Sequence, residues 1–492
     1  MQITKNLLAI DLGAESGRAI LGQLDGSRLV IREVHRFANT PVLLLDGLHW
    51  DVLRLFGEIK HSIAAAIHET SGRLDGIGLD TWGVDFGLLD RQGTLLANPY
   101  HYRDSRTDGM LQAAFARMPK EQIFNLTGIQ FMQLNSLFQL LAMAQASSPL
   151  LEIAETFLTM PDLFNYWLTG QKGCEFTIAT TTQCYNPRTR AWAEDMLARL
   201  GIPSRIFPRV IPTGSVLAYL LPTIANEIGA TAIPVIAPAC HDTASAVAAV
   251  PAQGDHYAWI SSGTWSIIGV SVKEPVINAQ SLAYNFTNEG GVNNTYRLSR
   301  NVMGLWLVQE SRRTWEHMGQ SYTYDELTRR ASGAPALQSI IDPDSIEFLK
   351  PGNMPARIRA FCERTEQPQP EDVGAVVRCT LESIALRYRW VIERLEELLG
   401  RRLDTIHIVG GGTKNRLLSQ LTADATGRPV ITGPIEATAA GNLLVQAMAI
   451  GELSSPDDLR AIVCRSFPVE TFHPAPSQAW DDAYHRFTEL AG

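Results

Sequence analysis

One supersecondary unit occurs twice in this chain of 492 residues, about half a chain apart. The first copy, at 7–24, is an apolar stretch, a turn with the sequence DLGAESGR, and a second apolar stretch. The second copy, at 258–268, reads AWISSGTWSII, and alignment of the two places Gly263 under Gly13. An apolar strand, a glycine turn and another apolar strand, present twice, predict two related domains.

The two copies differ at the end of their first strand. The first copy has Asp11 there, and the second has Ser261. Only one copy therefore offers a carboxylate, and this asymmetry favours a cleft that holds a metal ion on one side.

Strand-like and helix-like segments alternate along the remaining chain, which favours an α/β fold. Apolar side chains at helical spacing predict helices at 52–69 and 376–399. The first of these carries its apolar residues at Leu53, Phe56, Ile59, Ile63 and Ile67. Further expected elements are strands at 76–80, 405–409 and 429–432 and helices at 244–250, 416–425 and 437–450.

The turn-rich segment 251–255 is the best candidate for a domain boundary. The expected domains are residues 1–250 and residues 256–452, followed by a peripheral segment at 453–492. We expect helices in that last segment.

Charge and composition exclude several classes of protein. With 42 basic and 51 acidic residues the net charge is −9, which argues against a nucleic-acid partner. No apolar run reaches the ~18 residues of a membrane-spanning helix, and the first residues do not form a signal peptide. Six scattered cysteines without a CxxC pair favour a reduced, cytoplasmic protein. The sequence leaves the oligomeric state open.

The turn after Asp11 suits a phosphate, because glycines let backbone N–H groups approach its oxygens. Asp11, at the end of a strand, suits a hydrated Mg²⁺. An ordinary hairpin turn with an Asx cap explains the same residues. A Walker A loop, G-x-x-x-x-G-K-[ST], is absent from the chain.

Asp242 follows a strand in the sequence CHDTASA and precedes a helix of small residues. Its carboxylate can accept a proton from an attacking hydroxyl. A helix N-cap is the alternative interpretation, and a hydrogen-bonding structural role is the alternative for His241.

Two glycine turns in the second half of the chain suit a nucleotide. Thr264, in SSGTWS, can bind terminal phosphate oxygens, with a plain hairpin as the alternative. The three residues Gly410, Gly411 and Gly412 lie between a strand and a helix and leave a bare backbone on which an adenine ring can lie. A flexible loop is the alternative there.

Polar and aromatic residues at strand ends suit a sugar. They occur in DTWGVDF at 80–86, which contains Trp82 and Gly83, and in YRDSR at 102–106, which begins with Tyr102. A core tryptophan with a surface salt bridge explains the same residues.

The turn after Asp11, the CHDTASA stretch, the SSGTWS turn and the three glycines, together and in this order, resemble the FGGY family of sugar kinases. The stretches AIDLGAESGR, LDTWGVDFGLLD, YRDSRTDG, CHDTASAV, SSGTWSIIG and IHIVGGGTKNRLL are most similar to the members that phosphorylate L-rhamnulose. The resemblance implies an α/β fold with two actin-like (ribonuclease-H-like) domains flanking a nucleotide and sugar cleft. It also implies that the domain at 1–250 binds sugar and phosphate and that the domain at 256–452 binds adenosine.

The resemblance also implies roles for single residues. Asp242 matches the catalytic base, and Asp11 matches the acid that is associated with Mg²⁺. The sugar-binding positions are Gly83, His241, Asp242 and Thr243, with Trp82 and Tyr102 as neighbours. The ATP-binding positions are Ala14, Glu15, Ser16, Gly17, Arg18, Thr264, Asn301, Gln309, Gly410, Gly411 and Gly412. Glu15 stands where these kinases have serine, and we expect it to turn outward.

The activity that this resemblance implies is ATP-dependent phosphorylation of L-rhamnulose at its 1-hydroxyl in rhamnose catabolism. The cofactors are ATP and Mg²⁺, and the partners are a ketose and ATP, without nucleic acid or membrane. A related ketose, L-fuculose or L-xylulose, is the first alternative. A non-enzymatic actin-like ATP switch is the second.

Overall fold

The computed structural model describes residues 4–475 and 477–491 and divides into two compact units. The first unit comprises Met1–Ala249, Ser271–Leu298 and Ala437–Ser466, and the second comprises Val250–Val270, Ser299–Glu436 and Phe467–Gly492. The expected domains at 1–250 and 256–452 are continuous stretches, whereas each compact unit is assembled from three segments. The expected peripheral segment 453–492 is divided between the units.

A six-stranded sheet forms the centre of the first unit, in the order β13-β14-β6-β1-β2-β3. β1 pairs antiparallel with β2 and parallel with β6. The strands are β1 Lys5–Leu12, β2 Ser16–Leu24, β3 Leu29–Ala38, β6 Gly76–Thr81, β13 Ser215–Tyr219 and β14 Pro234–Ala237. The predicted turn between the first two strands is confirmed as the β1–β2 connection.

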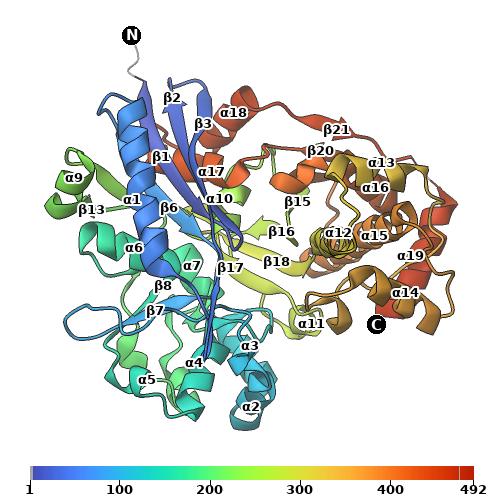
Figure 1. The fold of residues 1–492 in the computed structure, drawn as a ribbon, viewed down its shortest axis with the longest axis horizontal. Coiled ribbons are helices and arrows are strands. Elements are labelled where there is room, and N and C mark those ends of the chain that lie inside the picture. The colour runs from blue at the N-terminus through green and yellow to red at the C-terminus, as the bar shows by residue number, and fades with distance from the viewer. Residues whose placement is uncertain (1–3, 476, 492) are drawn as a thin grey trace. The chain divides into compact units, whose positions relative to one another are not determined.

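Helices cover both faces of this sheet, as Figure 1 shows. On one face α1 Val52–Glu69 and α6 Met160–Thr169 pack against the alternate side chains Leu8, Ile10 and Leu12 of β1. On the other face lies α17 Ala437–Ala449, drawn in red beside the blue strand β1. Because side chains alternate along a strand, Asp11 points to the α17 face.

α1 confirms the predicted helix, but its buried face differs from the predicted one. Leu53 is 66% exposed, while Val52 and Leu55 are fully buried. The helix begins after Asp51, whose side chain accepts a hydrogen bond from Arg54 N. The buried face of the helix is formed by Val52, Leu55, Ile59, Ile63 and Ala66, which recur at intervals of three or four residues. Leu53 lies outside this face.

Small residues let two helices of this unit come close together. α10 Asp242–Ala248 packs against α17. A Cβ added to Gly441 would lie 1.8 Å from the backbone oxygen of Ser245, so only glycine fits. The predicted helix at 244–250 begins two residues earlier than expected, at Asp242.

The remaining elements of the first unit are shorter or peripheral. They are β4 Val42–Leu44, β5 Gly47–His49, β7 Phe86–Leu89, α2 Met110–Arg117, α3 Lys120–Thr127, α4 Ser136–Gln145, α5 Pro149–Ile153, β8 Thr156–Thr159, β9 Cys174–Glu175, α7 Phe176–Thr181, β10 Tyr185–Asn186, β11 Ala191–Trp192, α8 Glu194–Leu200, β12 Val210–Ile211, α9 Pro222–Ile228, α11 Ala279–Ala283, β17 Thr287–Gly290 and α18 Pro456–Ser466.

The sheet of the second unit repeats the local topology of the first. β15 Tyr257–Ser262 pairs antiparallel with β16 Trp265–Val272 and parallel with β19 Thr405–Val409. This is the arrangement that β2 and β6 have around β1, so the predicted repeat is confirmed as a topology. β20 Val430–Thr432 continues the sheet beside β19.

Helices complete the second unit. They are α12 Trp306–His317, α13 Tyr324–Gly333, α14 Met354–Arg364, α15 Val373–Leu399, α16 Arg416–Thr426 and α19 Gln478–Ala491. α15 confirms the predicted long helix, which ends at Gly400 with φ of 64°. The helices expected after residue 453 are confirmed as α18 and α19, while β21 Glu470–Phe472, which pairs antiparallel with β20, was not expected. β18 Tyr296–Met303 begins in the first unit and ends in the second.

All six cysteines are free. Along the described chain, residues 4–475 and 477–491, no helix combines the length and the apolar character that a membrane crossing needs.

Candidate active site

The turn between β1 and β2 is held by its own backbone and by Asn39. Gly13 N donates to Ser16 O at 3.0 Å, and Asn39 Nδ2 donates to Gly13 O at 2.9 Å. A Cβ on Gly17 would lie 2.3 Å from the Phe37 ring, so this position is closely packed. Ala14 and Ser16 are partly exposed in the turn, and Glu15 is exposed, as expected of an outward-turned side chain.

Arg18 lies on Asp11 in this structure. Its Nε and Nη2 donate to Asp11 Oδ2 at 2.9 and 2.8 Å. The Asp11 side chain is only 5% exposed, so a nearby cation offsets part of the cost of its burial. The two residues are neighbours because Asp11 and Arg18 are partners in the β1–β2 register.

A second buried acid, Asp80, lies beside Asp11. The two residues are register partners on the parallel strands β1 and β6, so both point to the α17 face. Asn442 Nδ2 of α17 donates to Asp80 Oδ2 at 2.5 Å, while Asp80 Oδ1 is buried without a hydrogen-bond partner among the described residues. Burial, and then the charges of Asp11 and Asp242, raise the pKa of Asp80 well above its usual value.

Asp80 was expected at a strand end, in the DTWGVDF stretch that suits a sugar, whereas Asn442 was not predicted as part of the site. Asn442 and Gln446 lie four residues apart on one face of an otherwise apolar helix. Gln446 Nε2 donates to Leu8 O at 3.0 Å and to Asn442 Oδ1 at 2.7 Å. The presence of two amide side chains in an alanine-rich helix was the sequence signal that could have indicated Asn442.

Asp242 is the first residue of α10, and His241 occupies the N-cap position without a side-chain cap bond. The N-cap alternative for Asp242 is therefore wrong. Asp242 Oδ1 accepts from Thr243 N at 2.5 Å and from Thr243 Oγ1 at 3.1 Å. The Asp242 side chain is 28% exposed, which leaves the carboxylate accessible. Burial raises the pKa of Asp242; His241 opposes this shift and Asp11 adds to it.

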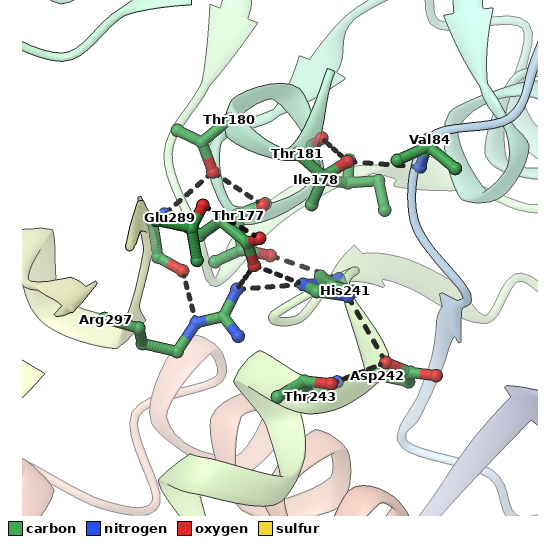
Figure 2. Close-up of polar contacts among 12 residues, drawn as sticks. Val84, Thr177, Ile178, Thr180, Thr181, His241, Asp242, Thr243, Glu289 and Arg297 are labelled. Carbon is green, nitrogen blue, oxygen red and sulfur yellow. Dashed lines mark hydrogen bonds and ion pairs between the residues drawn. The ribbon is translucent and has the colours of Figure 1, made fainter. Parts of the chain in front are cut away.

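The backbone before Asp242 is anchored by a fully buried carboxylate. Glu175 Oε2 accepts from Thr177 N at 2.9 Å and from Cys240 N at 3.2 Å. Thr177 Oγ1 in turn accepts from His241 N at 3.1 Å, as Figure 2 shows. Two residues of α7 and β9 thus fix the chain that leads into Asp242.

Gly83 lies on a strained part of the chain next to α7. Its neighbour Val84 has φ of 68°, an outlier for a β-branched residue. Thr181 Oγ1 accepts from Val84 N at 3.2 Å (Figure 2), and a Cβ on Gly83 would lie 3.2 Å from Thr181. Strain of this kind is often kept at functional sites. Nothing in the sequence indicated it.

The buried carboxylate Asp85 organises the aromatic residues. Its Oδ2 accepts from Trp50 Nε1 at 2.6 Å, from Trp82 Nε1 at 3.0 Å and from Tyr102 N at 3.2 Å. Burial raises the pKa of Asp85 to about 6, although donors including Gln139 oppose the shift. Trp82 is buried in the core, in agreement with the alternative interpretation as a core tryptophan. Tyr102 is partly exposed.

The glycine turn of the second unit is tied to the start of α12. Leu305 N donates to Gly263 O at 3.0 Å, and Trp306 N donates to Thr264 O at 3.1 Å. Asn301 lies on β18, and Gln309 lies in the first turns of α12. Gln309 Oε1 is buried and lacks a hydrogen-bond partner within the part of the chain that the structure describes.

The three glycines at 410–412 lie against the end of β15. Gly410 has φ of 88°, which favours glycine. A Cβ on Gly412 would lie 2.0 Å from Ser262 Oγ, whereas a Cβ on Gly411 would have nothing within 4 Å. Gly411 therefore presents open backbone, and Gly412 is closely packed.

Two family models match the chain. The N-terminal domain of the FGGY family of carbohydrate kinases matches residues 6–249, and its C-terminal domain matches residues 258–450. Curated relatives are named rhamnulokinase. One from Bacteroides thetaiotaomicron is 43% identical and covers 98% of this chain and 99% of its own. One from Pectobacterium atrosepticum is 39% identical and covers 99% and 97%.

Solved structures share the fold. A gluconate kinase from Lactobacillus acidophilus has a TM-score of 0.82 at 16% identity and covers 99% of this chain and 98% of its own. A glycerol kinase from Plasmodium falciparum has a TM-score of 0.78 at 16% identity, with 98% of each chain covered. The predicted fold class is confirmed as the two-domain α/β fold of these kinases. Their names differ in substrate, so the fold alone does not select the sugar.

Proposed function

Because this chain belongs to the FGGY family of carbohydrate kinases, we propose that it transfers the γ-phosphoryl group of ATP to the 1-hydroxyl of L-rhamnulose. Curated rhamnulokinases that are 39–43% identical over nearly the whole chain support this substrate. The observation that carries the mechanism is the accessible carboxylate of Asp242, which stands beside His241 with all its described contacts on one oxygen.

Asp242 acts as the general base. Its carboxylate takes the proton of the 1-hydroxyl while that oxygen forms a bond to the γ-phosphorus. The bond between the γ-phosphorus and the bridging oxygen breaks, and ADP leaves. A raised pKa makes Asp242 a stronger base than an ordinary aspartate, and the remaining work is positioning and charge stabilisation.

The acids of the first unit suit Mg²⁺. Asp11, Asp80 and Asp242 interact electrostatically, and Arg18 is the cation that contacts Asp11. Among residues 4–475 and 477–491, no group of three His, Cys, Asp or Glu side chains could hold a metal ion. A Mg²⁺ that keeps several waters needs only one or two carboxylates besides the phosphates. Asp11 would hold it, and the ion would supply charge neutralisation on the phosphates.

The nucleotide contacts are proposed for both units. In the first unit, residues Ala14 to Arg18 meet the phosphates through the β1–β2 turn. In the second unit, Thr264 meets the phosphates, and Asn301 and Gln309 contact the nucleotide. The open backbone at Gly411 and the unpartnered Gln309 Oε1 support this assignment. Gly410, Gly411 and Gly412 bind the adenosine.

The sugar contacts are proposed for the first unit. Gly83, His241 and Thr243 bind the ketose, and Tyr102 contributes a partly exposed ring. Trp82 is a buried neighbour of this site, because its N–H group donates to Asp85. The free cysteines support a reducing compartment, and we place the activity in the cytoplasm.

Identification of the product tests this function. The protein is incubated with MgATP and L-rhamnulose, and the product is analysed by ³¹P and ¹H NMR. We expect ADP and a phosphate monoester at carbon 1. Phosphorylation at another hydroxyl would contradict the proposed positioning, and inorganic phosphate without a sugar ester would contradict the kinase activity.

A further inference from the structure

A fully buried arginine lies next to the proposed sugar site, in the first unit. Arg297 of β18 has no exposed surface. Its Nε donates to Gly290 O at 2.9 Å, and its Nη2 lies 2.9 Å from Glu289 Oε2 and 2.8 Å from His241 Nδ1 (Figure 2). Burial of a charge is expensive unless the charge is paired, and Glu289 supplies the pair.

The strand that carries Glu289 is itself anchored. Gly290 N donates to Thr180 Oγ1 of α7 at 2.7 Å. Burial alone would raise the pKa of Glu289, but the charge of Arg297 is the largest of the contacts that lower it. Glu289 is therefore a carboxylate at neutral pH, and Arg297 is held from two sides.

The arginine determines which nitrogen of His241 carries the proton. A guanidinium has only donors, so the ring nitrogen at 2.8 Å, Nδ1, must accept. In a neutral imidazole the proton then lies on Nε2. Nε2 lies 3.4 Å from Asp242 Oδ1, so the proposed base is the nearest acid to this N–H group.

The opposite tautomer has one competing partner. Glu289 Oε2 lies 3.3 Å from His241 Nδ1 and would accept a proton from it. That distance is longer than the contact with Arg297, and the same oxygen already accepts from Arg297 Nη2. The geometry therefore favours the Nε2–H form.

We propose that Arg297 is a positioning residue that fixes His241 as the Nε2–H tautomer and thereby orients the carboxylate of Asp242. This inference rests on the proposed function, in which Asp242 is the general base. The contacts from Thr243 N, Thr243 Oγ1 and His241 Nε2 all go to Oδ1. Oδ2 is then the oxygen that takes the proton of the sugar.

The tautomer can be measured without substrate. The full chain is labelled with ¹⁵N-histidine, and the His241 signals are assigned by their loss in His241→Asn. We expect an unprotonated Nδ1 and a protonated Nε2 in the wild type. Arg297→Met should move the ring toward the Nδ1–H form, with Glu289 as acceptor. A wild-type Nδ1–H ring, or a ring that Arg297→Met leaves unchanged, would overturn the inference.

Kinetics give a second readout that a merely structural role would not move. We expect Arg297→Lys, which keeps the charge but not the planar fork, to lower kcat by about 10- to 100-fold. The KM for ATP should stay within about twofold, because Arg297 acts on the base. Arg297 Nη1 is buried and unpartnered within the described chain, so a rise confined to the sugar KM would mean direct substrate contact and would contradict positioning.

Arg188→Met is the matched control, because Arg188 also donates to backbone oxygens of the first unit, Asn125 O and Ile277 O. Arg188→Met should leave both the Nε2–H tautomer of His241 and kcat unchanged. If the Arg297 variants do not fold, Glu289→Gln replaces them: it exchanges the competing carboxylate for a neutral, weaker acceptor. The Nε2–H form should then persist, and a shift to the Nδ1–H form would overturn the inference. A wild type that is inactive on every sugar would refute the proposed function, while the tautomer measurement would still decide the role of Arg297.

Discussion

Asp242 combines the two properties that a general base requires, access and basicity. Its side chain is partly exposed, and burial raises its pKa. Its Oδ1 is occupied by Thr243 and faces His241, which leaves Oδ2 for the proton. The geometry of one residue therefore leads to a direct prediction about turnover.

Asp242→Asn removes the base without changing the shape of the side chain. We expect kcat to fall by about 10²–10⁴-fold, because the amide cannot take the proton. ATP affinity, measured by titration calorimetry, should stay the same. Asp75→Asn, at a partly exposed acid that binds Lys5 in the same unit, is the control and should keep full activity. Near-normal turnover in Asp242→Asn would refute the base assignment.

Asp85 yields a pH-dependent prediction. Its pKa of about 6 lies above the value of 3.8 for an unperturbed aspartate, so the folded state binds more protons between these values. The stabilisation is fully present below pH ~4 and is lost as the pH rises through ~6. Asp85→Asn does not titrate. The free energy of unfolding of the wild type relative to this variant should therefore decrease by about 1 kcal/mol between pH 5 and pH 8.

Urea titrations of both proteins at the two pH values measure this difference. A constant gap between them, or one that widens as the pH rises, would show that Asp85 does not hold its proton in the folded state. The same residue orients Trp82 and Tyr102, so its loss should also weaken sugar binding.

Several residues of the site were accessible from the sequence because each lies in a recognisable pattern. Asp11 lies near the end of a strand, Asp242 stands between a strand and a helix of small residues, and three consecutive glycines are rare. Arg297, Glu289 and Asn442 lie far from those motifs along the chain. Only the fold brings them to His241 and Asp80. A buried charge pair leaves no periodic signal in a sequence, so it was not predicted.

At the scale of elements, the loop between β19 and α16 contains glycines with different surroundings. Gly412 is packed against Ser262, so any side chain there would clash within the protein. Gly411 faces open space, so a side chain there would meet only a ligand. This difference makes Gly411 the position at which the proposed nucleotide platform can be tested.

Gly411→Ala should leave the melting temperature unchanged and raise the KM for ATP by about tenfold, which corresponds to ~1.4 kcal/mol. Gly412→Ala is the matched variant and should lower the melting temperature as well, since its Cβ would lie 2.0 Å from Ser262 Oγ. Steady-state kinetics and thermal unfolding of both variants measure this. An unchanged KM in Gly411→Ala would mean that adenosine does not lie at this position.

The elements themselves were largely predictable where they are long and periodic. α1 and α15 were recognised from helical spacing, and β1 and β19 from apolar runs. The error at Leu53 arose because an apolar residue near a helix start can lie outside the buried line. β21 was missed because its three residues become a strand only by pairing with β20.

At the scale of the whole molecule, the two units share a local topology but not their chemistry. The first carries Asp11 where the second has Ser261, so the carboxylate at this strand end belongs to the first unit alone. The repeat was visible in the sequence. The three-segment composition of each unit was not, because only packing joins residues 437–466 to the first unit.

The choice of sugar is the central claim, and it rests on similarity to curated relatives rather than on the fold. A coupled assay that follows ADP formation with MgATP and a panel of L-rhamnulose, L-fuculose and L-xylulose tests it most directly. We predict that kcat/KM for L-rhamnulose exceeds that for the other ketoses by at least about tenfold. A higher kcat/KM for another ketose would contradict the substrate assignment, and ADP formation that no sugar stimulates would contradict the kinase activity.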